Sequence, residues 1–129
     1  MRKRAILRGR AERDSYAPRF VDLSEFSSVT GVDWRTLARW LDNGPIWVPT
    51  PAVVLGGKRR PGWEPEIPPT WEPGLNGAER QEPREYLDIT QMKRRYGMSE
   101  ATLWVCIVED RTIPMPAMWL AGQPGWLPH

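Results

Sequence analysis

Hydrophobic positions along the chain alternate between helical and extended spacing. Leu23, Phe26 and Val29 recur at helical intervals directly after Asp22. Asp22 and Glu25 stand three residues apart, which is the spacing of a capping box at the start of a helix. The pattern therefore predicts a helix that begins after Asp22.

A second helix is predicted shortly after the first. Gly31 interrupts the helical pattern, and Asp33 is a residue type that helix N-caps favour. The apolar face that follows has the spacing i, i+3, i+4: Leu37, Trp40 and Leu41. Asn43 and Gly44 are typical of a helix end, so we expect the helix to end there.

Extended structure is predicted next. Residues 49–55 combine prolines with valines and a leucine, Gly56 and Gly57 provide a turn, and residues 60–63 return. This pattern predicts a short β-hairpin. Ile67 and Trp71, four residues apart, indicate a short helix that closes the unit.

The same pattern occurs a second time further along the chain. Residues 20–26 resemble residues 86–92, and Asp88 and Ser99 take the places of the two predicted N-caps. We therefore expect a mostly α chain with small β-hairpins, built from two copies of one module in tandem. The expected organisation is a basic N-terminal tail (1–15), a first copy (16–73), a linker (74–84) and a second copy (85–129).

Charge is divided unevenly between the two halves of the chain. Residues 1–60 carry a net charge of +6, and residues 61–129 carry −4, which together give the net charge of +2. A basic half favours a polyanionic partner. The distribution indicates that the first half, and not the second, is built to meet nucleic acid.

Several classes of function find no support in the sequence. No apolar run approaches the roughly 20 residues that span a bilayer, and no long apolar stretch follows the basic N-terminus, so we expect neither membrane association nor a secretory signal. The single cysteine, Cys106, fits a reducing cytoplasm, and its alignment with Trp40 suggests a buried thiol. With His129 as the only histidine and no Cys/His cluster, we expect no catalysis, metal or cofactor.

The order of these features resembles the AlpA, excisionase and MerR-like family of winged helix-turn-helix proteins, including small phage and prophage proteins of actinobacteria. The resemblance is closest in the first copy, in these segments: Leu23-Ser24-Glu25, Gly31-Val32, Thr36–Leu41, Gly44 and Gly57–Trp63. It implies two tandem winged helix-turn-helix modules and binding to double-stranded DNA. Members of the family act as excisionases or as small transcriptional regulators. They place the second helix in the major groove and the hairpin, or wing, on the flanking backbone or in the minor groove.

Candidate DNA contacts follow on the second helix and the wing. We expect Arg35 and Arg39 to read bases, because arginine pairs with the O6 and N7 atoms of guanine, and Thr36 to meet a phosphate. Trp34 either packs on sugar rings or covers the start of the helix. The wing places three cations where they can meet phosphates: Lys58, Arg59 and Arg60.

The N-terminal tail is also rich in cations. Its candidate contacts are Arg2, Lys3, Arg4, Arg8 and Arg10. Basic arms of this kind enter the minor groove in some DNA-binding proteins. The equally open alternative is a disordered tail that is attracted to nucleic acid without specificity.

The second copy differs from the first where DNA contacts are expected. Glu100, Ala101 and Val105 stand in place of Trp34, Arg35 and Arg39. Residues 103–108 are apolar on all sides, so this helix must be covered by the first copy, by a second chain or by another protein. The candidate interaction residues are Trp104, Val105 and Val108, and candidate partners are integrase, RNA polymerase or a second copy of the chain.

Two further points stay open at the level of sequence. Lys93, Arg94 and Arg95 on the first helix of the second copy form either a solvated face or a phosphate contact. The alternative function is a protein-interaction module of phage origin that binds a host or phage protein without reading DNA. RNA binding ranks last, because the aromatic stacking sheet of the usual RNA-binding modules is not visible.

Overall fold

The computed structural model describes residues 2–75, 77 and 81–128, and these residues form a mixed α/β structure. In this part of the chain there are six helices and two small three-stranded sheets, with about 40% helix and 18% strand. The elements are α1 (Arg2–Asp14), β1 (Arg19–Phe20), α2 (Leu23–Thr30), α3 (Trp34–Asn43), β2 (Val53–Leu55), β3 (Arg60–Gly62), α4 (Ile67–Thr70), β4 (Arg84–Tyr86), α5 (Ile89–Tyr96), α6 (Glu100–Val108), β5 (Met118–Leu120) and β6 (Gln123–Gly125).

The order strand, helix, helix, hairpin occurs twice, and we call β1–β3 with α2–α3 the first repeat and β4–β6 with α5–α6 the second repeat. Equivalent hydrogen bonds recur in the two repeats. The indole of Trp63 donates to the carbonyl of Pro49 at 2.8 Å, and the indole of Trp126 donates to that of Pro114 at 2.9 Å. The internal similarity of the sequence is therefore accompanied by a similarity of local structure.

The four helices α2, α3, α5 and α6 begin where the sequence predicts. Asp22 accepts a hydrogen bond from the backbone N–H of Glu25, and Asp33 accepts one from Arg35. In the second repeat Asp88 forms a complete capping box with Gln91. Ser99 accepts from the N–H of Thr102 at the start of α6. Gly31 (φ 76°) and Gly97 (φ 61°) end α2 and α5 in the left-handed conformation that glycine adopts without strain.

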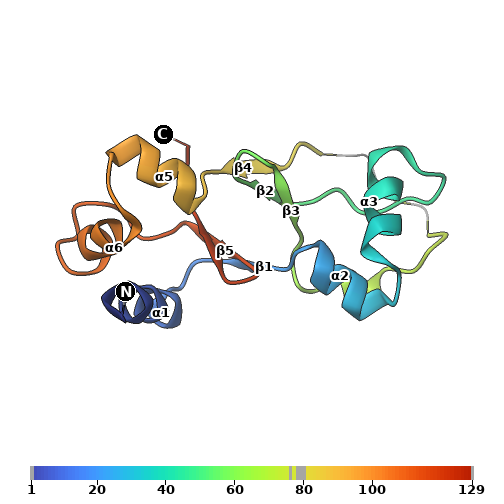
Figure 1. Ribbon diagram of the computed structural model, residues 1–129. Helices are drawn as coiled ribbons and strands as arrows, with labels where there is room; N and C mark the ends of the chain where they lie inside the picture. Colours follow the sequence, from blue (N-terminus) through green and yellow to red (C-terminus); the bar gives the residue numbers. More distant parts are fainter. Residues whose placement is uncertain (1, 76, 78–80, 129) are drawn as a thin grey trace.

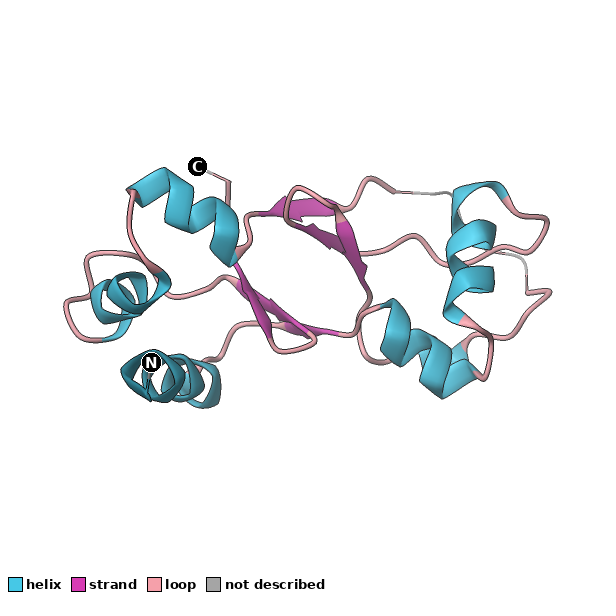
Figure 2. Cartoon of the chain, viewed as in Figure 1, coloured by secondary structure: helices cyan, strands magenta, loops and turns pink. Residues whose placement is uncertain are grey.

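The two hairpins are each completed by a strand from the other repeat. β1 pairs in parallel with β5, and β4 pairs in parallel with β2, so both sheets combine the two repeats (Figure 1). These short strands turn two hairpins into three-stranded sheets, which is why the architecture is mixed α/β and not mostly α. The sheets lie in the middle of an elongated molecule, with helices at both ends (Figure 2).

Three apolar clusters form the core. The first repeat packs around Phe26, whose ring meets Trp63 and Trp71 edge-on, with centroids 4.9 and 5.4 Å apart. A central cluster joins the two sheets, and its buried members are Val53, Leu55, Tyr86, Met118 and Leu120. A third cluster lies in the second repeat around Trp104 and Trp126 and includes Leu7 and Ala11 of α1. The strands of both hairpins thus contribute buried side chains to the core.

The N-terminal segment, expected as a tail, forms the helix α1. Leu7 and Ala11 are buried against the second repeat, and α1 packs along α6. The N-terminal helix of the same chain therefore supplies cover for the apolar α6, a source that the sequence alone did not suggest. Among the helices of the described residues, none combines the length and the apolar character needed to cross a membrane.

Candidate nucleic-acid interface

The outer face of α3 presents cationic and aromatic side chains to solvent. Leu37 on the inner face is fully buried, and this fixes α3 against the core of the first repeat. Arg35 and Arg39, one helical turn apart, are both exposed, and Trp34 is 50% exposed. Thr36 is half-buried beside them. The structure therefore brings together the four residues of α3 that the sequence singles out.

Among the described residues, no acidic side chain pairs with the arginines of α3. Within residues 2–75, 77 and 81–128, no ion pair joins Arg35 or Arg39 to a carboxylate. The guanidinium of Arg35 lies 5.3 Å from the ring centroid of Trp34, in the range of a cation–π contact. This contact leaves the donors at the edge of the guanidinium free and limits the conformations of the side chain.

The three cations of the first hairpin, expected to act together, have different surroundings in the structure. Arg59 forms an ion pair with Glu85 of β4, and Arg60 approaches Asp22 to 3.4 Å. Lys58 is exposed in the turn and forms no ion pair with any described residue. Glu85 and Asp22 come from distant parts of the sequence, so the pattern of residues 58–60 alone does not reveal these pairs. Exposed ion pairs contribute little, about 0–1 kcal/mol, so both arginines can exchange a carboxylate for a phosphate.

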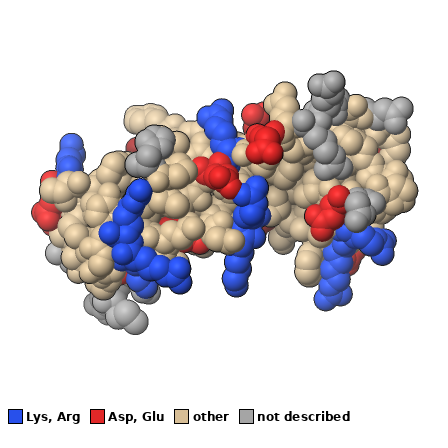
Figure 3. Space-filling view, turned by 90° about the horizontal axis from the view of Figure 1, so that it is seen from above, with Lys and Arg blue, Asp and Glu red and all other residues tan. Residues whose placement is uncertain are grey.

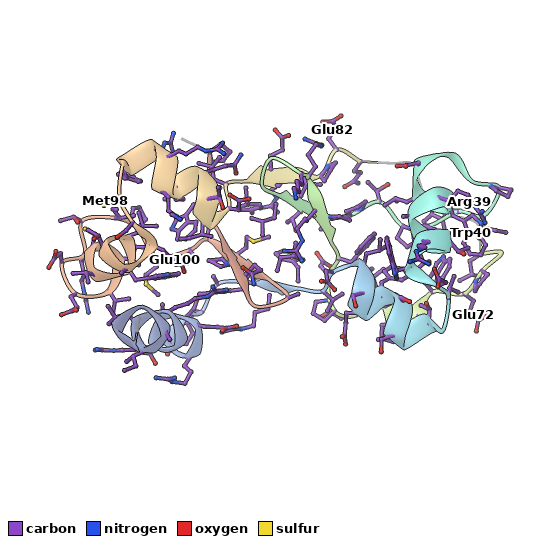
Figure 4. All side chains as sticks on the ribbon, viewed as in Figure 1. Arg39, Trp40, Glu72, Glu82, Met98 and Glu100 are labelled. Carbon is purple, nitrogen blue, oxygen red and sulfur yellow. The ribbon has the colours of Figure 1, made fainter. Side chains whose placement is uncertain are left out.

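The hairpin and the outer face of α3 do not form one compact group. Arg39 lies on α3 at one end of the molecule, whereas β2 and β3 lie near its middle (Figure 4, Figure 1). Trp34, at the start of α3, is closer to the hairpin, because it lines a shallow hollow together with Arg60 and Pro61. The start of α3 is therefore the part that can act together with the hairpin.

The N-terminal cations have a different environment from the one expected. The side chains of Arg2, Lys3 and Arg4 lie outside the described part of the structure. Arg8 of α1 donates to the carbonyl of Gly122 at 3.0 Å, in the turn between β5 and β6, and lies 3.8 Å from Glu100 of α6. Arg10 is exposed on α1 and lines a hollow that Arg111 also lines. For α1 to serve as a minor-groove arm, it would have to leave α6.

The second repeat does not offer an equivalent of the outer face of α3. Trp104 is fully buried and donates its indole N–H to Glu100 at 3.2 Å, while Val105 and Val108 are half-buried against the core. The three candidate interaction residues are thus part of the packing around α6. Cys106 is half-buried as well, with its sulfur 3.9 Å from that of Met98.

An exposed apolar group that the sequence analysis missed lies elsewhere in the second repeat. Tyr96 (40% exposed), Met115 (41%) and Leu127 (49%) line one hollow beside Trp126. They come from the end of α5 and from two separate loops, so no periodic pattern marks them. Apolar side chains that line one hollow are typical of contact surfaces.

Charged side chains are distributed over the length of the molecule. Figure 3 shows Lys and Arg side chains in several separate places on the face seen from above, with acidic side chains between them. This face therefore carries a broken row of cations and not one continuous basic patch. In the described part of the chain, no group of three or more His, Cys, Asp or Glu residues is arranged to hold a metal ion.

The described residues form two interlocked repeats, and α3 exposes the two arginines Arg35 and Arg39 on its outer face. Comparison with protein-family models, with curated proteins and with solved structures gives no match to this chain.

Proposed function

We propose that the chain binds double-stranded DNA through the outer face of α3, as the first of two tandem winged helix-turn-helix modules. The observation that carries the proposal is the pair Arg35 and Arg39, which are exposed, one turn apart and without ion pairs to the described residues. An arginine on a helix that lies in the major groove can donate two hydrogen bonds to guanine. Because α3 is capped by Asp33 and anchored by Leu37, the helix that carries both arginines is held in place before DNA binds.

The other residues of α3 support the same geometry. Thr36, between the two arginines, is suited to a phosphate, and Trp34 offers a half-exposed ring to a sugar. The proposed biological role is that of an excisionase-like protein or a small transcriptional regulator. In both roles the second repeat would contact the protein partner, with integrase, RNA polymerase and a second copy of the chain as candidates.

A direct experiment starts from selection of bound duplexes out of a random pool, followed by fluorescence anisotropy with a selected and a scrambled duplex. We expect Arg35→Ala and Arg39→Ala each to lower affinity for the selected duplex about ten- to hundredfold, corresponding to about 1–3 kcal/mol for a base-reading arginine. Arg13→Ala, an exposed change on α1, removes the same charge and should alter affinity little. If no duplex is enriched, or if all three variants behave alike, the proposal is wrong.

A second candidate function is binding to another protein without reading DNA. The observation that favours it is the exposed apolar group formed by Tyr96, Met115 and Leu127. Under this alternative, Tyr96→Ser and Met115→Ser abolish the activity of the chain in its host, and Arg35→Ala leaves that activity unchanged. Host activity measured with these variants therefore separates the two functions.

A further inference from the structure

Two surface hollows meet at the first hairpin. The first hollow lies between α2, α3 and β3 and is lined by Asp22, Leu23, Ser24, Trp34, Arg60 and Pro61. The second hollow lies between the hairpin turn and α5 and is lined by Leu55, Gly57, Lys58, Arg60, Asp88, Thr90, Gln91 and Arg94. Arg60 lines both, so one surface continues from the start of α3, in the first repeat, to α5, in the second.

Cations outnumber acids in the second hollow. Lys58, Arg60 and Arg94 line the second hollow together with one acid, Asp88. One carboxylate oxygen of Asp88 already accepts the N–H of Gln91 as a helix cap. Arg60 is already paired with Asp22 at 3.4 Å, so Lys58 and Arg94 against Asp88 leave the hollow with a net positive charge, which favours an anion. Thr90, with its hydroxyl, and the Gln91 amide also line the hollow and add hydrogen-bonding capacity.

Among the three neighbouring cations of α5, Arg94 is the one suited to an external partner. Arg95 donates to the carbonyl of Pro128 at 2.8 Å and so holds the C-terminal segment. Lys93 is half-buried. Arg94 is exposed, and no ion pair joins it to an acidic residue of the described chain. The structure thus separates residues that the sequence presents as one basic run.

We propose that the second repeat takes part in DNA binding through the second hollow, where Lys58 and Arg94 together hold a backbone phosphate. This inference rests on the proposed function of α3. The duplex would extend from Arg35 and Trp34 across Arg60 to Arg94, along a surface that runs over both repeats. The second repeat then contributes a backbone contact through its first helix, α5, although its second helix, α6, is covered by α1.

The test measures the salt dependence of binding to the selected duplex. Each neutralised phosphate contributes about 0.9 to the slope of log affinity against log salt concentration. We expect Arg94→Gln and Lys58→Gln each to reduce the steepness by about 0.9 or less and to lower affinity several-fold at low salt. The matched control is Arg95→Gln, which removes the same charge from the adjacent position and should leave the slope nearly unchanged. Unfolding curves of all three variants exclude a loss of structure as the cause.

Failure of this inference differs from failure of the proposed function. If Arg35→Ala abolishes selective binding while Arg94→Gln and Lys58→Gln behave like Arg95→Gln, the second hollow does not hold phosphate, and the role of α3 stands. If Arg35→Ala and Arg39→Ala leave binding intact, the proposed function falls, and the inference falls with it. Reduced slopes for Arg94→Gln and Lys58→Gln, together with loss of binding for Arg35→Ala, support both.

Discussion

Two glycines show at the scale of single residues how the repeats fit together. A Cβ atom at Gly62 would lie 2.6 Å from Cδ1 of Leu120, and one at Gly125 would lie 2.9 Å from Cδ1 of Leu55. Each glycine therefore allows a leucine of the opposite repeat to approach its backbone. This close approach gives a physical reason for the glycine in both Pro-Gly-Trp segments of the sequence.

We predict that Gly62→Ala lowers the free energy of unfolding by about 1–3 kcal/mol, the usual cost of overpacking a well-packed core. Leu120 is fully buried and has little room to move away. The measurement is urea unfolding followed by tryptophan fluorescence. Gly57→Ala, in the turn of the same hairpin, meets only Gln91 at 3.9 Å and should change stability by less than about 0.5 kcal/mol. Equal effects of the two substitutions would mean that the close contact with Leu120 is unimportant.

The candidate site also shows, residue by residue, what sequence alone can predict. Arg35 and Arg39 follow from helical spacing, because local periodicity decides which face of a helix is exposed. Arg59 and Arg60 look equivalent in sequence, yet Glu85 and Asp22 engage them in the structure. Such pairs depend on contacts between distant segments, which no local pattern contains.

At the scale of elements, too, the sequence predicts what local residues determine and misses what depends on contacts between distant segments. α2, α3, α5 and α6 begin after local capping residues and were predicted. α1 has no capping signal and only a narrow apolar side, Leu7 and Ala11, so its stability depends on packing against α6. β1 and β4 have no adjacent hairpin partner in the sequence, because the strands with which they pair lie in the other repeat. Local sequence patterns therefore do not predict that the two repeats share both sheets.

Neighbouring residues of α1 provide a test of its role as the cover of α6. Leu7 is 5% exposed, and Ile6 is 63% exposed. We expect Leu7→Ala to lower the free energy of unfolding by about 2–5 kcal/mol, as is typical of a buried leucine. Ile6→Ala should change it by less than about 0.5 kcal/mol. Urea unfolding of both variants measures the difference, and similar values for the two would contradict the packing of α1 on α6.

At the scale of the whole molecule, the strand pairing makes the two repeats parts of one structure. Leu55 in β2 belongs to the same buried cluster as Met118 and Leu120 in β5. Helices at opposite ends are thereby connected through the sheets between them. Since β4 of the second repeat completes the sheet of the first, and β1 completes that of the second, neither sheet is complete within its own repeat.

This connection predicts cooperative unfolding of both repeats. Leu55→Ala should increase amide hydrogen exchange in α2 and α3 and also in α5 and α6, because loss of packing in the shared core destabilises both ends. Hydrogen exchange followed by mass spectrometry resolves these segments. Faster exchange restricted to the first repeat would show that the repeats unfold independently.

The most direct test of the central claim is a titration of the labelled protein with a selected DNA duplex, followed by the chemical shifts of its backbone amides. If DNA is bound by the outer face of α3, the amides of residues 34–39 should shift most, with further changes at residues 57–60 and near Arg94. The amides of α6, covered by α1, should change little. Shifts concentrated around Tyr96, Met115 and Leu127, or no shifts at all, would contradict the claim that α3 is the DNA-reading helix.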